Sequence, residues 1–204
     1  MTNGLKKKSP VSNADVKSYT KVNNLRHIER RKAPDLQAHY HPAGLNGVTK
    51  PYVQSRSNHV TMHELGHANS MNRTRKALGG IGAKSKFGAI LASQKATMGI
   101  GGLVGAYAAT SDNEKVRKYA PAAVALASVP LLHEEAKATL SPAKHLFKTR
   151  GAKVAGKFLS RMAPAYGTYV AAAATGVGAT SWAKHIKEKA IKIRDTKHKL
   201  LHGE

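Results

Sequence analysis

The chain of 204 residues contains no cysteine, few aromatic residues (5%) and only 11 acidic residues against 34 Lys and Arg. Without cysteine there are no disulfides, and any metal site must use histidine and carboxylate ligands. The scarcity of aromatic side chains argues against a stacking platform for single-stranded nucleic acid. The residues that follow Met1 are polar and basic, so we expect no signal peptide.

The charge balance is +23, and basic residues are spread over both ends of the chain. Such a field favours anionic partners, either membrane phospholipids or nucleic acid bound through the basic termini. The length predicts one domain, or one small domain with attached helices. Residues 1–44 form a predicted basic N-terminal arm, which is disordered or loosely attached up to about residue 24. A short charged helix is expected between 25 and 40 and ends near Pro34.

A short motif gives the clearest chemical signal. Residues 63–67 read His-Glu-Leu-Gly-His, which is the H-E-x-x-H pattern of zincins. On a helix, His63 and His67 share a face and can bind one metal ion, and Glu64 can act as a general base on a metal-bound water. Zn²⁺ would lower the pKa of that water to about 7. Gly66 within this helix suggests a close approach of another backbone.

The surroundings of the motif leave alternatives open. Residues 47–60 are predicted to form short extended segments, and a strand there would align a peptide substrate beside the helix. His39, His41 and His59 are further candidate ligands, although histidines in such positions are more often plain loop residues. The two motif histidines themselves could instead be a loop or core pair without a metal.

Two apolar runs follow the motif, from Phe87 to Thr110 and from Tyr119 to Leu132, separated by a polar turn. They predict an apolar helical hairpin over residues 87–133. The uncharged part of the first run is about 16 residues, short of the roughly 20 that cross a bilayer. Gly101 and Gly105 form a small-xxx-small pair that lets helices approach closely.

Carboxylates stand directly after this hairpin, at Glu134 and Glu135. If both runs cross or dip into a bilayer, these side chains return to the side of His63 and His67. One of them would then complete a two-histidine, one-carboxylate shell that leaves a fourth position open for water. A pair of solvated carboxylates at a helix end is the competing interpretation.

H-E-L-G-H, an apolar hairpin and then E-x-x-A-T resemble the membrane-embedded gluzincin metallopeptidases, over about residues 45–145. This group includes relatives of the CaaX prenyl proteases, of the heat-shock proteases, and of the neutral zinc membrane peptidases of bacteria. The resemblance implies a zincin-like core with zinc as cofactor, and its E-x-x-A motif maps the third ligand to Glu135, with Glu134 as the alternative. Many members carry Asp where this chain has Thr139.

Ser141 and Pro142 are expected to begin a helix. Residues 146–204 then form the last predicted part of the chain, with a third apolar segment and a basic C-terminal helix. A third apolar stretch runs from Phe158 to Trp182, with Tyr169 and Trp182 as interfacial anchors. The basic tail after it is a predicted amphipathic helix, either on an anionic membrane surface or solvated as a terminal helix. The apolar helices could also pack in water as a bundle of small residues.

The sequence therefore predicts a mainly α protein with an H-E-x-x-H helix, a short β segment and apolar hairpins that associate with a membrane. The expected function is a zinc-dependent endopeptidase, bacterial or phage-encoded, with peptide substrates. His63, His67 and Glu135 hold the metal, Glu64 activates water, and His133 and His145 are candidate transition-state stabilisers. Lys and Arg near residues 73–86 and 137–161 place the active site on the cytoplasmic side.

The alternative function is non-enzymatic. A strongly basic, membrane-active or virion-associated structural protein would bind anionic lipid or nucleic acid through the same composition, and the H-E-x-x-H match would then be incidental.

Overall fold

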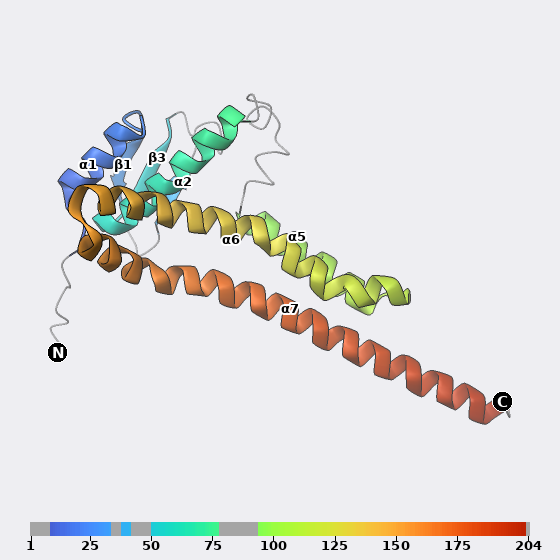
Figure 1. The fold of residues 1–204 in the computed structure, drawn as a ribbon. Coiled ribbons are helices and arrows are strands. Elements are labelled where there is room, and N and C mark those ends of the chain that lie inside the picture. Colours follow the sequence, from blue (N-terminus) through green and yellow to red (C-terminus); the bar gives the residue numbers. More distant parts are fainter. Residues whose placement is uncertain (1–8, 34–37, 42–49, 78–93, 203–204) are drawn as a thin grey trace. The chain divides into compact units, whose positions relative to one another are not determined.

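The computed structural model describes residues 9–33, 38–41, 50–77 and 94–202. They form α1 (Asn13–Val22), β1 (Glu29–Lys32), β2 (His39–His41), β3 (Tyr52–Ser55), α2 (Asn58–Ala77), α5 (Gln94–Thr110), α6 (Glu114–Arg150) and α7 (Ala152–His202) (Figure 1). The prediction of a mainly α fold with a short β segment is confirmed. Among the described helices, none has the length and apolar character that crossing a membrane requires.

The chain divides into two compact units. The sheet unit consists of residues 1–89 and 133–166, and the helical unit consists of residues 90–132 and 167–204. The long helices α6 and α7 each contribute residues to both units.

Helix α1 corrects the prediction of a disordered or loosely attached arm for residues 13–22, and residues 1–8 of that arm lie outside the described part. Ser12 caps α1 in a capping box, in which the Asp15 backbone N–H donates to the Ser12 hydroxyl and the Asp15 carboxylate accepts from the Ser12 backbone. Val16 and Tyr19 are then fully buried. These two side chains lie three residues apart on one face of α1 and pack it against the core. Their burial stabilises the helix although most of the segment is polar.

A three-stranded sheet of order β1-β3-β2 follows, with β1 parallel and β2 antiparallel to β3. The helix predicted for residues 25–40 is therefore wrong at β1. The side chains of Glu29–Lys32 are all exposed, and their backbone pairs with Tyr52–Ser55 instead of forming a helix. The Arg31 guanidinium lies 4.0 Å from the Tyr52 ring centroid and 2.9 Å from Glu29.

Helix α2 packs against α1, β2 and β3. Met62, Leu65 and Ala68 recur at a spacing of three and are all buried, so one face of α2 enters the core of the sheet unit. The core joins residues from α1, β3, α2 and the sheet-unit parts of α6 and α7, including Tyr19, Val53, Leu146, Phe158 and Met162.

The apolar hairpin is present as α5 and the first part of α6, joined at residues 111–113; residues 87–93 lie outside the described part. Helix α6 then continues without a break to Arg150, so the predicted new helix at Ser141 is wrong. The Ser141 hydroxyl does not cap a helix, because it is hydrogen-bonded to the Tyr19 hydroxyl at 2.8 Å. Gly151, with φ of +81°, separates α6 from α7.

Candidate metal centre

The centre starts on α2, where the helix places His63 and His67 on one face, with ring centroids 4.8 Å apart. Gly66 lies between them and allows α6 to approach. A Cβ built on Gly66 would overlap the backbone carbonyl of Ala138. The close packing suggested by a glycine in this helix is therefore present, and its partner is the turn of α6 that follows Glu135.

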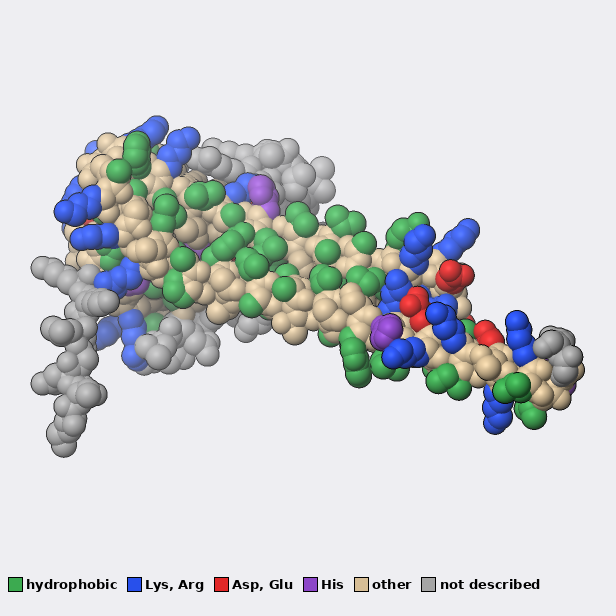
Figure 2. All heavy atoms as spheres, turned by 60° about the horizontal axis from the view of Figure 1, so that its bottom comes forward, with side chains coloured by type: hydrophobic (Ala, Val, Ile, Leu, Met, Phe, Trp, Pro, Cys, Tyr) green, Lys and Arg blue, Asp and Glu red, His purple; other side chains and the backbone are tan. Residues whose placement is uncertain are grey.

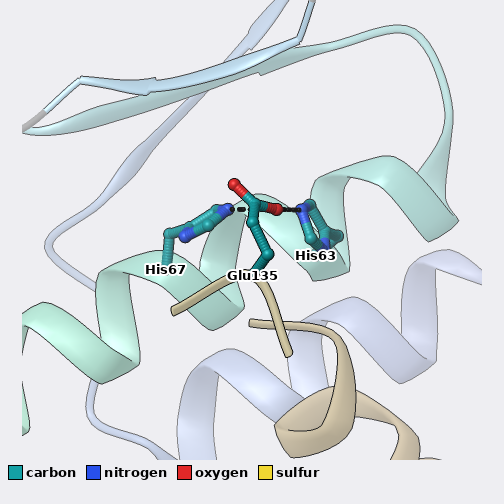
Figure 3. Close-up of side chains that lie close together, drawn as sticks. All are labelled: His63, His67 and Glu135. Atoms are coloured by element: carbon teal, nitrogen blue, oxygen red, sulfur yellow. Dashed lines mark ion pairs between the residues drawn. The ribbon is translucent and has the colours of Figure 1, made fainter. Parts of the chain in front are cut away.

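Helix α6 supplies the third group. The Glu135 side chain is 2% exposed, and its Oε2 lies 3.3 Å from Nε2 of His63 and 3.5 Å from Nε2 of His67. Figure 3 shows the carboxylate between the two imidazoles. Glu135, Ala138 and Thr139 recur at i, i+3 and i+4, so the contact of Ala138 with Gly66 presents the same face of α6 to both histidines.

The electrostatics of the three side chains are strongly coupled. Burial opposes ionisation of Glu135, but hydrogen bonds and charge from His63 and His67 lower its pKa to about 2. Burial likewise disfavours a charged His67, yet Glu135, and more weakly Glu64 and Glu134, raise the pKa of His67. The buried carboxylate is therefore ionised at neutral pH and attracts positive charge to this point.

Thr139 holds the other side of His63. Its Oγ1 lies 3.1 Å from Nδ1 of His63, and both side chains are buried. When Nδ1–H donates to the threonine hydroxyl, the Nε2 lone pair is directed to the side of Glu135. The sequence singled out position 139 only because Thr stands there in place of Asp; its contact could have been expected from its i+4 spacing to Glu135.

Glu64 lies next to His63 in the chain and is 8% exposed. It belongs to the same site electrostatically, because its charge contributes to the raised pKa of His67. It is not one of the three side chains that converge. This separation is what a general base needs, since it must remain free of the metal to accept a proton.

Glu134, the alternative third ligand, makes other contacts. Its Oε2 accepts a hydrogen bond from the Ser70 hydroxyl at 2.5 Å, and its Oε1 lies 3.7 Å from the Lys137 ammonium. Ser70, which the sequence reading did not single out, is buried on α2 one turn after His67. Adjacent residues on a helix point about 100° apart, so only one of the two glutamates faces the histidines.

The remaining candidate histidines lie apart from this group. His133 is exposed. His145 stacks edge-on against Tyr19, with ring centroids 5.4 Å apart, and burial lowers its pKa. His59 is hydrogen-bonded to Ser9 at 3.2 Å, His41 stacks on Tyr52, and the side chain of His39 is outside the described part.

The donor set fits a zinc ion. Two imidazole nitrogens and one carboxylate oxygen lie within 4.8 Å of one another, and this is the one cluster of three or more metal-binding side chains among the residues that the structure describes. Two histidines and a glutamate are the shell of catalytic zinc sites that keep one position open. The Thr139 contact adds the hydrogen bond that orients a ligating histidine.

In comparisons with known proteins, no family model, no curated protein and no solved structure matches the chain.

Proposed function

We propose that the chain is a zinc-dependent endopeptidase. The observation that carries the proposal is the convergence of His63, His67 and Glu135 on one point, with Glu64 beside them. These four residues come from two helices more than sixty positions apart in the chain. A chance H-E-x-x-H match gives no reason for a buried glutamate to meet both histidines.

In this proposal His63, His67 and Glu135 hold the metal, and Thr139 fixes the orientation of His63. Zinc bound there would polarise the peptide carbonyl and lower the pKa of a water molecule to about 7. The Glu64 carboxylate accepts a proton from the water that attacks the carbonyl carbon. It then delivers that proton to the amide nitrogen as the C–N bond breaks, which leaves a carboxylic acid and an amine.

The proposed enzyme acts at a membrane, with its site on the cytoplasmic side of a bacterial or phage-infected cell. What supports this placement is the sequence, in which uncharged runs adjoin Lys- and Arg-rich segments on the side of the motif. The alternative, a non-enzymatic membrane-active or virion-associated protein, is supported by the charge of +23.

Hydrolysis of a quenched fluorescent peptide library tests the enzymatic proposal. We expect cleavage that a chelator abolishes and added zinc restores. Glu64→Gln should keep its zinc and lose at least about a hundredfold in rate, because it removes the proton acceptor and leaves the three ligands in place. Glu134→Gln is the matched control and should cleave like the wild type. Equal rates for Glu64→Gln and wild type would contradict the proposal.

A further inference from the structure

The helical unit buries mainly small residues, together with Val124 and Leu131, and exposes most of its large apolar ones. At its centre Gly105 of α5 contacts Val124 of α6 and Thr180 of α7. Ala109 and Ala120 are also buried there. A bundle in water normally places its leucines and aromatic residues in such positions.

Most of the large apolar side chains of these helices instead point outward. Leu103 is 75% exposed and Leu126 is 71% exposed, and the exposed set also contains Val104, Tyr107, Tyr119, Val129, Val170 and Trp182. Figure 2 shows hydrophobic side chains on the surface of this unit. Single exposed apolar residues are ordinary, but a set contributed by three adjoining helices marks a surface that contacts an apolar partner.

The same surface carries no charge along much of its length. No charged residue occurs in residues 96–111, 119–132 or 167–183. At about 1.5 Å per residue, residues 167–183, the uncharged part of α7 that belongs to the helical unit, are about 25 Å long. A band of that length fits within the hydrocarbon layer of a bilayer, which is about 30 Å thick.

Charged side chains gather beyond one end of the band. The Lys187 ammonium on α7 lies 2.8 Å from Asp112, at the junction of α5 and α6. Three exposed aromatic residues stand beside this end: Tyr107 precedes the junction, Tyr119 follows it, and Trp182 lies five residues before Lys187. Tyr and Trp favour the level of lipid headgroups, where the ring is half apolar and half hydrated.

The C-terminal part of α7 is positively charged, as binding to anionic headgroups requires. In residues 184–199, Lys and Arg outnumber Asp and Glu by seven to two. Ile193 and Leu200 are nevertheless exposed among them, so this part of the helix offers both cations and apolar side chains.

We propose that the exposed apolar surface of the helical unit binds an anionic phospholipid bilayer. The leucines and valines of the band enter the acyl region, Tyr107, Tyr119 and Trp182 lie at the headgroup level, and the basic tail contacts anionic headgroups. This goes beyond the proposed peptidase activity, because the surface and its ligand would be the same if no zinc were bound.

Trp182 is the only tryptophan of the chain, so its fluorescence reports directly on this surface. The full-length protein is mixed with vesicles of phosphatidylcholine alone or of phosphatidylcholine with phosphatidylglycerol. We expect the emission of Trp182 to shift to shorter wavelength with the anionic vesicles and to respond much less to the neutral ones. Lipids brominated near the headgroup end of the acyl chain should quench it more than lipids brominated at the chain terminus.

Two variants on α6 make the test specific. Leu126→Glu places a charge within the band, and Phe147→Glu places one at a similarly exposed position of the sheet unit. Both side chains are exposed, so neither change should unfold the protein. We expect Leu126→Glu to lower the vesicle partition coefficient at least about tenfold, the order expected for one leucine side chain left out of the acyl region, and Phe147→Glu to leave it unchanged.

Two results would overturn the proposal. One is a Trp182 spectrum that no vesicle changes, together with sedimentation of the protein apart from the lipid. The other is a Trp182 shift that depends on protein concentration without lipid and accompanies dimers in analytical ultracentrifugation, which would assign the surface to a second copy. His67→Ala should bind vesicles as the wild type does, so loss of the metal site and loss of the lipid surface are separate outcomes.

Discussion

The sheet unit and the helical unit differ in the size of the side chains that they bury. The sheet unit buries Tyr19, Leu65 and Phe158 and holds the ionised Glu135 inside this core. The helical unit buries mainly glycine, alanine and threonine, with Val124 and Leu131, and leaves Leu126 and Trp182 outside. The first arrangement gains stability from apolar area removed from water and can carry the cost of a buried charged site. The second gains close helix contact and keeps its apolar area available for a partner.

The largest effect is expected for a glycine at a helix contact of the sheet unit. Gly66→Ala should abolish zinc binding and strongly destabilise the sheet unit, because the added Cβ overlaps backbone of Ala138 that cannot rotate away. Gly156→Ala in α7 is the matched control in the same unit, since nothing lies within 4 Å of its added Cβ. It should stabilise the protein by about 0.5–1 kcal/mol. Thermal denaturation followed by circular dichroism measures both, and equal melting temperatures for Gly66→Ala and wild type would refute the close contact.

Leucine truncation compares the two kinds of packing directly. Leu65→Ala removes a side chain that is 1% exposed and should lower the free energy of unfolding by about 2–5 kcal/mol. Leu126→Ala removes one that is 71% exposed and should change it by less than about 0.5 kcal/mol. Urea denaturation in detergent-free buffer gives both values. A large loss for Leu126→Ala would show that its side chain is packed within the protein.

Thr139 is the next most sensitive position of the sheet unit. Thr139→Val keeps the shape of the side chain and removes the hydroxyl that orients His63. We expect zinc affinity to fall about 10–100-fold, the usual cost of losing a hydrogen bond to a ligating histidine. Thr139→Ser retains the hydroxyl and should bind zinc nearly as tightly as the wild type. Competition with a chromophoric chelator measures the zinc affinities. Equal affinities for the valine and serine variants would show that the Thr139 hydroxyl does not orient His63.

Ion pairs give the smallest expected contrast. Burial alone would raise the pKa of Asp15, but hydrogen bonds from Ser12 and the Arg150 guanidinium at 2.9 Å lower it. The lowered pKa means that this carboxylate stabilises the fold above about pH 4 and that the contribution is lost as the pH falls further. In the helical unit, Asp112 pairs with Lys187 but its side chain is 84% exposed.

Melting temperatures between pH 7 and pH 3 test that contrast. Asp15→Asn should cost about 1–2 kcal/mol at pH 7, and its deficit relative to the wild type should shrink at pH 3, where Asp15 is losing its charge. Asp112→Asn should change stability by less than about 0.5 kcal/mol at either pH, as for other exposed pairs. A deficit of Asp15→Asn that is constant with pH would show that the charge of Asp15 is not what stabilises α1.

The features that follow from local spacing were predictable from the sequence. His63 and His67 share a helix face because they are four residues apart, and the apolar runs 96–110 and 119–132 fall within α5 and α6. The strand at Tyr52–Ser55 precedes the motif helix, as its composition indicates.

The features that depend on distant partners were not predictable in this way. Glu29–Lys32 form a strand by pairing with β3. Ser141 lies inside α6, where its hydroxyl is hydrogen-bonded to Tyr19, 122 residues earlier in the chain. The choice between Glu134 and Glu135 depends on which face of α6 meets Gly66. The resemblance to the E-x-x-A motif had assigned the ligand to Glu135, and Ala138, the alanine of that motif, is the small residue that contacts Gly66.

The central claim is that His63, His67 and Glu135 form one metal site, and zinc content of the purified protein tests it most directly. The protein is passed over a weak chelator first, to strip zinc from surface pairs such as His198 and His202, whose rings lie 4.3 Å apart on α7. We predict about one zinc per chain in the wild type and in Glu134→Gln, and none in His67→Ala or Glu135→Gln. The same zinc content in Glu135→Gln and wild type, or no zinc in folded wild type, would contradict the account.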